Sequence, residues 1–273
     1  MQIIRSIEEL RSARNSMDGS VGFVPTMGAL HRGHLSLIRR SVEENDHTVV
    51  SVFVNPAQFL PGEDLEAYPR REEADAKICE IAGVDILFMP EISSMYGSDE
   101  VKLKAPEYLG YILEGNRRPG HFDGVVRVVM KLFGLVGPKR AYFGKKDAQQ
   151  LVILQKMVND LFLPVEIVPV DTVREEDGLA LSSRNVYLTP EERRRALSIS
   201  RSLKSASRLI MAGEYDCAKI AEHMLGIMRD IDVEYVRIVD RSFRPLERVE
   251  IQNSIILVAA RVGKTRLIDN LWI

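Results

Sequence analysis

The chain is 273 residues long, with 45% hydrophobic residues, 28% charged residues and a formal net charge of -2. That length exceeds the size at which one hydrophobic core usually stops growing, so two domains are expected. The composition is that of a globular protein and excludes a disordered chain. The near-neutral charge provides no basic footprint for nucleic acid, so we expect none to bind.

The sequence also argues against membrane insertion and against a disulfide framework, and we expect neither. The longest apolar stretch, residues 255–260, is far too short to cross a bilayer. The first ten residues interrupt their apolar residues with charges and lack the core of a signal peptide. The two cysteines, Cys79 and Cys217, lack metal-type spacing. These features predict a cytoplasmic protein.

Predicted strands and helices alternate through the first two-thirds of the chain. Strands are predicted over 21–25, 48–55, 85–89, 140–144 and 164–170, and helices near 33–45, 71–82, 124–136 and 147–161. This alternation predicts an α/β fold, a Rossmann-like parallel sheet with helices on both faces. Ligands of such sheets bind beyond the carboxyl ends of the strands, so residues directly after strands should carry the function.

The pattern changes after about residue 173. Thr189, Pro190 and Glu192 predict a helix start, with a hydroxyl N-cap, proline at the first helical position and a glutamate that completes a capping box. This helix should run to about 211 and be followed by a helix near 216–229 and strands over 233–240 and 254–262. We therefore predict a nucleotide-binding domain over 1–175 and a smaller α+β lid domain over 176–273.

The segment PTMGALHRGH, residues 25–34, follows the first of these predicted strands. Backbone N–H groups at a helix N-terminus bind anions, and Gly33 allows a ligand to approach closely. His31 and His34 could donate to phosphate oxygens as negative charge develops. Two surface histidines are the plainer alternative, and a metal site lacks a nearby third ligand. Because the pair directly follows a strand, we favour phosphate binding.

Two further polar clusters are weak by themselves. The segment FGKKDAQQ, residues 143–150, offers lysines suited to a polyphosphate, although taken alone it is better explained as a solvated helix start with Asp147 as N-cap. The segment DGLALSSRN, residues 177–185, places two hydroxyls before an arginine. It could be an oxyanion clamp or simply a polar linker.

Six segments together resemble the pantoate–β-alanine ligase (pantothenate synthetase) family. They are PTMGALHRGH, FVNPAQF (53–59), AYPR (67–70), RPGHFDGV (118–125), FGKKDAQQL (143–151) and DGLALSSRN, in the family's order and spacing. The first and last also resemble the HIGH-type and KMSKS-type elements of the nucleotidylyltransferase superfamily. Two positions depart from the pattern: Lys145 stands where many members carry glutamate, and Leu181 where many carry methionine. Neither departure removes a catalytic group, although Lys145 could alter the affinity for ATP.

The resemblance implies an ATP-dependent condensation of (R)-pantoate with β-alanine, giving pantothenate, AMP and pyrophosphate through a pantoyl-adenylate. Mg²⁺ is implied as a companion of ATP, held mainly by phosphates, with Asp75 as a candidate protein contact. The family also suggests a homodimer formed through the first domain.

The resemblance implies the site residues position by position. Catalytic roles fall to His31, His34, Lys146 and Arg184, with His34 as proton donor. The ATP site is expected to comprise Met27, Gly28, Ala29, Leu30, His31, Arg32, Gly33, His34, Gly144, Lys145, Lys146, Asp147, Val173, Leu181, Ser182, Ser183 and Arg184. Pantoate is expected at Gln58 and Gln150, with Pro25, Thr26 and His121 beside it. His121 is explained equally well as a structural residue bonded to Asp123.

Two rival functions explain less of the sequence. A transferase of the same superfamily that acts on a phosphorylated substrate gives no reason for the two glutamines. A nucleotide sensor would not need donors placed where charge develops. Residues 263–265, Gly-Lys-Thr, imitate the end of a P-loop, but Val258 stands where the first glycine is required and a strand precedes it. Residues 193–195, three arginines, are predicted to form a solvated helix face.

Overall fold

A computed structural model describes residues 1–63 and 65–273 of the chain. Its internal contacts divide it into two compact units. The first unit comprises Met1–Gly144 and Gln149–Val170, and the second comprises Lys145–Ala148 and Asp171–Ile273. The domain boundary expected between residues 175 and 176 stays a prediction. That four residues after Gly144 group with the second unit was not foreseen from the sequence.

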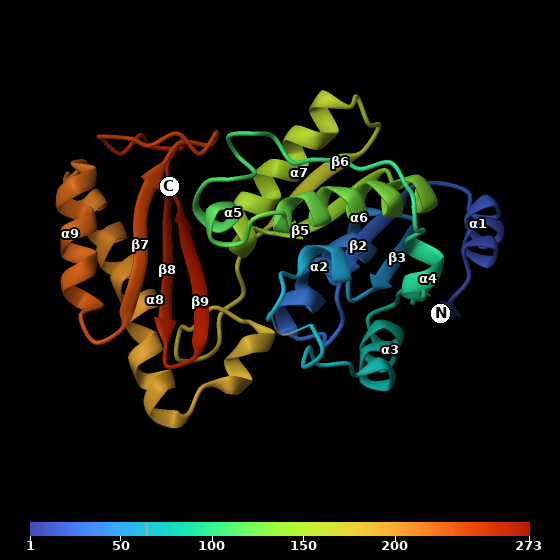
Figure 1. Cartoon of the computed structure of the whole chain (residues 1–273), viewed down its shortest axis with the longest axis horizontal. Coiled ribbons are helices and arrows are strands. Elements are labelled where there is room, and N and C mark those ends of the chain that lie inside the picture. The colour runs from blue at the N-terminus through green and yellow to red at the C-terminus, as the bar shows by residue number, and fades with distance from the viewer. Residues whose placement is uncertain (64) are drawn as a thin grey trace. The chain divides into compact units, whose positions relative to one another are not determined.

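The first unit contains a six-stranded parallel sheet in the order β1-β4-β3-β2-β5-β6. Figure 1 labels β3, β2, β5 and β6 of this sheet. Its strands are β1 (Gln2–Ile4), β2 (Val21–Thr26), β3 (His47–Val52), β4 (Ile86–Phe88), β5 (Arg140–Gly144) and β6 (Glu166–Val170). The predicted α/β class is confirmed. Strand β1 was not predicted because three residues are too few to show an alternation. Strand β3 ends earlier than predicted because Asn55 caps a 3₁₀ turn that begins at Pro56.

Helices cover this sheet and bury its apolar side chains. They are α1 (Ile7–Asn15), α2 (Arg32–Glu44), α3 (Glu72–Ile81), α4 (Ile92–Met95), α5 (Leu113–Arg117), α6 (His121–Val136) and α7 (Ala148–Asp160), with the 3₁₀ turn η1 (Pro56–Gln58). Helix α2 packs against β2, β3 and β5, and α6 packs against β2 and α1. The core between α2 and the sheet includes Val24, Ile38 and Val50, all without exposed surface.

The order of the strands reverses between β2 and β5, which pair through Gly22 with Arg140 and Phe23 with Ala141. In a parallel α/β sheet, the ligand site lies at the carboxyl ends of the strands beside such a reversal. Strand β2 ends at Thr26, inside the segment with the histidine pair, and β5 ends at Gly144. The fold therefore places the first predicted cluster at the expected edge of the sheet.

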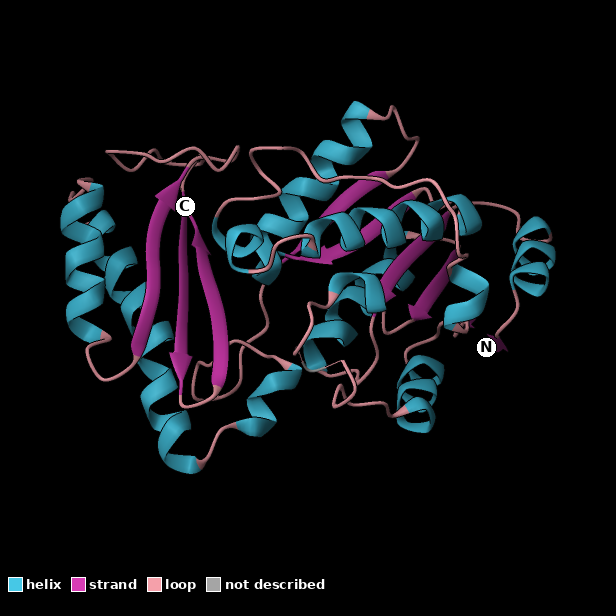
Figure 2. Cartoon of the chain, in the orientation of Figure 1, coloured by secondary structure: helices cyan, strands magenta, loops and turns pink. Residues whose placement is uncertain are grey.

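The second unit is an α+β structure with its own core. Figure 2 shows its antiparallel sheet of β7 (Asp232–Val239), β8 (Ile255–Val262) and β9 (Thr265–Trp272). Its helices are α8 (Pro190–Met211) and α9 (Cys217–Ile227), with 3₁₀ turns η2 (Lys145–Asp147) and η3 (Ser183–Tyr187). The capping box predicted for α8 is confirmed, since Thr189 Oγ1 accepts from the Glu192 N–H and the Glu192 carboxylate accepts from the Thr189 N–H.

Strand β9 was not predicted, and it shows what the Gly-Lys-Thr segment forms. Gly263, with φ of +58°, and Lys264 make a two-residue turn between the paired residues Val262 and Thr265. A hairpin turn between two strands is not a phosphate loop before a helix, which confirms the rejection of a P-loop.

Two other expectations concern the whole described part of the chain. Cys79 and Cys217 are both free and buried, as expected without a disulfide framework. Across residues 1–63 and 65–273, the helices are all too short or too polar to cross a membrane.

Candidate active site

His31 and His34 form the entrance of helix α2. His31 is the N-cap, and its Nδ1 accepts from the Gly33 N–H at 3.1 Å, while His34 Nδ1 accepts from the His31 N–H at 3.3 Å. The two rings stack with their centroids 4.1 Å apart and an interplanar angle of 25°. The pair is therefore a capping box made of histidines, which orients both rings.

This capping decides which ring nitrogen can donate. A neutral imidazole carries one proton, and a nitrogen that accepts an N–H cannot carry it. Both Nδ1 atoms accept, so the proton of each neutral ring lies on Nε2. The two imidazoles are thus prepared as Nε2–H donors at a helix N-terminus, where the helix dipole favours an anion.

The loop before these histidines is held by Asp75, from helix α3. The carboxylate is 1% exposed, and it accepts from the Ala29 N–H at 2.9 Å and the Leu30 N–H at 2.7 Å. Burial raises the pKa of Asp75, against the opposing effect of these two N–H groups. Ala29 has a φ of +50°, a conformation that a residue other than glycine keeps only when its surroundings enforce it. The buried carboxylate supplies that constraint.

Gln58 lies at the end of η1 and faces Met27. Its side chain is 9% exposed; its Oε1 accepts from Asn55 Nδ2 at 3.0 Å, and its Nε2 donates to Met27 Sδ at 3.0 Å. A thioether is a weak acceptor, so the second bond could be exchanged for one to a substrate at little cost. The described contacts bring Gln58 beside the loop of the histidine pair.

His121 anchors the backbone of Gln58. Its Nδ1 lies 2.7 Å from the Gln58 carbonyl oxygen, and its Nε2 lies 3.1 Å from Arg118 Nη1. Because the guanidinium can only donate, Nε2 accepts and Nδ1–H donates. Burial, and next the charge of Arg118, lower the pKa of His121 to about 4, so the ring is neutral at pH 7. The structural alternative named Asp123 as the partner of His121 and was wrong in that detail, since the two ring nitrogens bond to Arg118 and to the Gln58 carbonyl.

A salt bridge completes this anchor. Arg118 Nε and Nη2 each lie 2.6 Å from a carboxylate oxygen of Glu63, and Nη2 also donates to the Gln58 carbonyl at 3.2 Å. Burial alone would raise the pKa of Glu63, but the bonds from Arg118 hold it below its usual value. A bidentate pair of this kind fixes direction as well as distance. The first residue of α6 and the loop after η1 are thereby tied to the position of Gln58.

Gln149 and Gln150 are neighbours with different surroundings. Gln149 is 4% exposed, and its amide donates to the carbonyls of Leu109 and Ile112, both at 2.8 Å, and accepts from the Glu114 N–H. Gln150 is only half-buried. Gln149 therefore has a structural role that the sequence did not reveal, and Gln150 stays the predicted pantoate contact of the two.

In the second unit, Lys145 and Lys146 belong to η2. Lys145 Nζ lies 2.6 Å from Asp171 Oδ1, so the charge that departs from the family pattern is paired. Lys146 Nζ lies 3.7 Å from Asp147 Oδ1, a longer contact with a half-exposed carboxylate. Of the two lysines, Lys146 has the weaker ion pair and is the better candidate to bind an anion.

Ser182, Ser183 and Arg184 form the start of η3. Ser182 is its N-cap and accepts from the Arg184 N–H at 3.2 Å. The preceding turn is not a loose linker, because Arg193 binds the carboxylates of Glu175 at 2.7 Å and Asp177 at 2.8 Å. Of the three arginines expected on a solvated face, Arg193 thus has a specific structural role that only the fold shows.

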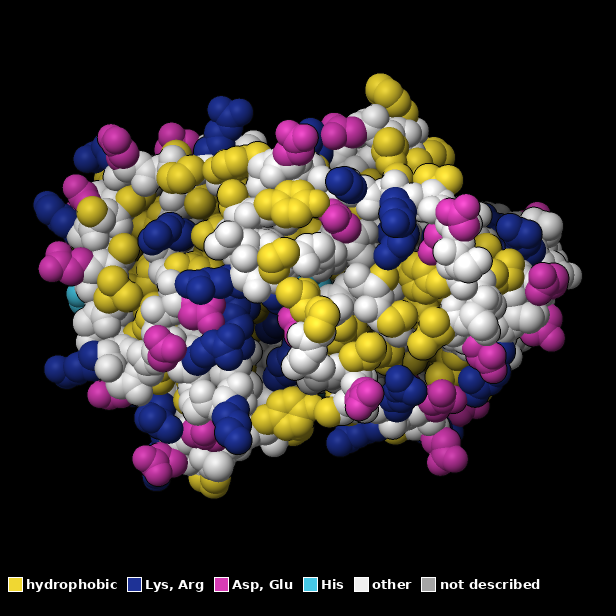
Figure 3. All heavy atoms as spheres, in the orientation of Figure 1, with side chains coloured by type: hydrophobic (Ala, Val, Ile, Leu, Met, Phe, Trp, Pro, Cys, Tyr) yellow, Lys and Arg dark blue, Asp and Glu magenta, His cyan; other side chains and the backbone are white. Residues whose placement is uncertain are grey.

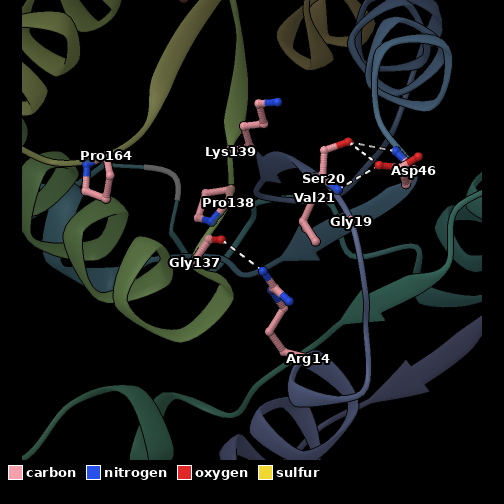
Figure 4. A pocket seen from close by; sticks show the side chains of 9 residues that line it. All are labelled: Arg14, Gly19, Ser20, Val21, Asp46, Gly137, Pro138, Lys139 and Pro164. Atoms are coloured by element: carbon pink, nitrogen blue, oxygen red, sulfur yellow. Dashed lines mark hydrogen bonds between the residues drawn. The ribbon is translucent and has the colours of Figure 1, made fainter.

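A pocket of about 460 Å³ in the first unit lies at the amino ends of strands β2 and β5, opposite the carboxyl ends where the predicted site lies. It is lined by Arg14, Gly19, Ser20, Val21, Asp46, Gly137, Pro138, Lys139 and Pro164 (Figure 4). Strands β2 and β5 begin here, at Val21 and Arg140. The Arg14 guanidinium donates to the carbonyls of Val136, Gly137 and Met17 and so caps the C-terminal end of α6. Its lining contains none of the predicted site residues, so this pocket is not the predicted site.

The predicted site residues fall into two groups, one in each unit. The first unit holds Pro25, Thr26, Met27, Gly28, Ala29, Leu30, His31, Arg32, Gly33, His34, Gln58, Asp75, His121, Gly144 and Gln150. The second unit holds Lys145, Lys146, Asp147, Val173, Leu181, Ser182, Ser183 and Arg184. Sequence reasoning missed Asn55, Glu63 and Arg118 as residues that position Gln58. Asn55 before Pro56 is a common turn signal, and it was the one sign in the sequence that a turn holds Gln58.

The face of the molecule drawn in Figure 3 intersperses basic, acidic and hydrophobic side chains. A parallel α/β sheet whose reversal point carries a helix entrance with oriented donors is typical of enzymes that bind a nucleotide or another phosphate compound. The fold and the first unit's site thus define a nucleotide-binding α/β enzyme.

Comparison with known proteins identifies the family. The family model for pantoate-beta-alanine ligase matches residues 2–272. Pantothenate synthetases from Aliarcobacter butzleri and Campylobacter fetus are 59% and 60% identical to this chain over 273 residues, with 100% of each chain covered. The chain belongs to the pantoate–β-alanine ligase family.

Solved structures support the same assignment. The crystal structure of pantothenate synthetase from Thermus thermophilus superposes with a TM-score of 0.94 at 46% identity, covering 100% of this chain and 99% of that chain. The ligase from Francisella tularensis superposes with a TM-score of 0.82 at 34% identity, covering 100% and 97%. That structure is described as a complex with beta-gamma ATP and beta-alanine.

Proposed function

We propose that this chain condenses (R)-pantoate with β-alanine at the expense of ATP and releases pantothenate, AMP and pyrophosphate. The observation that carries the proposal is the stacked histidine pair at the N-terminus of α2, whose capping bonds orient both rings and place the proton of each neutral ring on Nε2. Membership of the ligase family supports it independently.

The reaction proceeds in two steps that the chemistry of a carboxylate requires. A carboxylate oxygen of pantoate attacks the α-phosphorus of ATP, and the bond to pyrophosphate breaks. This gives pantoyl-adenylate, in which AMP is a good leaving group. The free amine of β-alanine then attacks the acyl carbon, the bond to AMP breaks, and the amine loses a proton. The amine must react unprotonated because an ammonium has no lone pair.

The charge that builds on the phosphates defines the roles of the donors. His31 and His34 donate hydrogen bonds through Nε2–H, and the Nε2–H of His34 stabilises the negative charge of the departing pyrophosphate. Lys146 supplies a point charge, and Ser182, Ser183 and Arg184 donate to the phosphate oxygens. Donors already oriented before the reaction lower the barrier because they need no reorganisation as charge develops.

Pantoate is held by amides rather than by charges. Gln58 and Gln150 can both donate and accept, which suits a substrate with two hydroxyls and a carboxylate. In this proposal, Gln58 exchanges its weak bond to Met27 Sδ for a bond to pantoate. His121 acts mainly through the Gln58 backbone, since both of its ring nitrogens are already engaged. Pro25 and Thr26 border the same substrate at the end of β2.

Mg²⁺ is proposed to arrive with ATP and to be held by phosphate oxygens and water. Among residues 1–63 and 65–273, His, Cys, Asp and Glu do not gather in any group of three that could hold a metal ion. Both oxygens of Asp75 accept backbone N–H groups. A cation that keeps most of its waters and binds mainly to phosphate oxygens, as Mg²⁺ does, needs few protein ligands. A contact from Asp75 to the ion stays a prediction.

We further propose that the chain acts as a homodimer in the cytoplasm and that its second unit serves as a lid during the reaction. Sedimentation of the purified protein tests whether the chain is a homodimer. A monomer at the concentrations used for kinetics would contradict it.

Exchange of labelled pyrophosphate into ATP tests the function. The first step is reversible, so exchange should require pantoate and should not require β-alanine. Enzyme, ATP, Mg²⁺ and pantoate should also release about one pyrophosphate per active site in a burst. A transferase would need another substrate for exchange, and a nucleotide sensor would show none. The absence of pyrophosphate before β-alanine is added would contradict the adenylate mechanism.

A further inference from the structure

Strand β9 carries a buried amide that contacts the backbone of the two lysines in η2. Asn270 is 5% exposed, and its Nδ2 donates to the carbonyl oxygens of Lys145 at 2.9 Å and Lys146 at 2.7 Å. Trp272 Nε1 donates to Asn270 Oδ1 at 3.0 Å. Both N–H groups and the oxygen of the amide are thus engaged. These partners also settle its orientation, since only the nitrogen can donate to two carbonyls.

The residue before Asn270 on β9 is Asp269, which binds the turn that leads into Ser182–Arg184. That segment is the other part of the second unit that is predicted to bind phosphate. Arg174 forms a bidentate pair with Asp269, with contacts of 2.6 Å and 2.9 Å. Arg174 also donates to the Gly178 carbonyl and pairs through its backbone with Ala180. This turn leads directly into Ser182, and β9 lies against both η2 and η3. Two adjacent residues of one strand therefore tie together the segment of Lys146 and the segment of Ser182–Arg184.

We propose that Asn270 is a positioning residue, which fixes the backbone of Lys146 on β9 and so holds the lysine at a set distance from the Ser182–Arg184 segment. The inference rests on the proposed role of Lys146 in binding phosphate. Asn270 itself touches no substrate. Its effect on the reaction passes through Lys146, and a displacement of about 1 Å in a catalytic group can lower a rate by about 100-fold.

Asn270→Asp is the sharpest variant because it keeps the shape of the side chain and removes both donors. The new carboxylate would face two carbonyl oxygens at hydrogen-bonding distance, so the backbone of η2 must move away. Asn270→Ala removes the donors without adding charge and serves if the aspartate variant does not fold. Asn159→Asp, at an exposed position of α7, is the matched control for the added charge.

Single-turnover formation of pantoyl-adenylate is the measurement, with enzyme in excess over labelled ATP and with pantoate and Mg²⁺ present. We expect Asn270→Asp and Asn270→Ala to slow this step by about 10- to 100-fold, while Asn159→Asp keeps the wild-type rate. In a Lys146→Ala background, the Asn270 substitutions should add less than about a twofold loss, because the residue through which they act is gone. Thermal unfolding identifies variants that have lost their fold.

A wild-type adenylation rate in a folded Asn270→Ala variant would overturn the inference. Losses that multiply with those of Lys146→Ala would also overturn it, because Asn270 would then act through another group. If the wild-type protein shows no pantoate-dependent exchange, the proposed function fails instead. If exchange is normal in the wild type but Lys146→Ala retains it in full, the role of Lys146 fails, and the inference fails with it.

Discussion

Replacing Gly124 with alanine tests how helix α6 positions Gln58. Gly124 lies in the first turns of α6, directly against η1, and Asn55 Nδ2 donates to its carbonyl at 3.1 Å. A Cβ at this position would lie 2.1 Å from the Ala57 carbonyl oxygen and 2.7 Å from the Gln58 nitrogen. Both atoms belong to the backbone, so rotation of a side chain cannot relieve the contact.

The size of the effect follows from these distances. Non-bonded contacts of a Cβ are essentially never shorter than 3.0 Å, so η1 must move by about 1 Å. Overpacking of this kind costs about 1–3 kcal/mol of folding free energy, against about 1 kcal/mol gained in helix propensity. Because Gln58 moves with η1, kcat/KM for pantoate should fall by about 10- to 100-fold, and the KM for ATP should change little.

Gly134 offers a matched control in the same helix. A Cβ at Gly134 would meet no atom within 4 Å. Gly134→Ala should therefore stabilise the protein by about 0.5–1 kcal/mol and leave the kinetics unchanged. Steady-state kinetics with each substrate varied, together with denaturant unfolding, measure both variants. A folded Gly124→Ala variant with the wild-type KM and kcat for pantoate would refute this account of the site.

Three further predictions concern single residues. His34→Ala should slow pyrophosphate exchange by about 100- to 1,000-fold with the circular dichroism unchanged, and near wild-type exchange would exclude His34 as a donor. Gln58→Ala should raise the KM for pantoate more than that for ATP in steady-state assays, and equal changes would point to a folding defect. The pKa of His121 is lowered from 6.5 to about 4 in the folded protein. Between pH 4 and pH 6.5 the unfolded state therefore binds more protons than the folded state. Stability should therefore fall by up to about 3 kcal/mol as the pH drops from 6.5 through 4. His121→Asn should remove that part of the slope in denaturant melts at several pH values, and an unchanged slope would assign it to other groups.

The sequence by itself determined the features that depend on near neighbours in the chain. The start of α8 at Pro190 follows from Thr189 and Glu192, which bond to each other's backbone across three residues. The parallel α/β class follows from an alternation that each strand and helix shows locally. The histidine pair could be placed at a helix entrance for the same reason, because His31 and His34 cap the helix they begin.

Only the tertiary structure decided which polar residues work together, because their partners lie far apart in the sequence. Asp75 binds the Ala29 N–H across 46 positions, and Asn270 binds the Lys146 carbonyl across 124. The neighbours Gln149 and Gln150 have different surroundings because the partners of Gln149 are also distant in the sequence. Gln149 donates to the carbonyls of Leu109 and Ile112, and Gln150 is half-buried. No pattern of near neighbours contains such contacts, so the chain must fold before the positions of these side chains are defined.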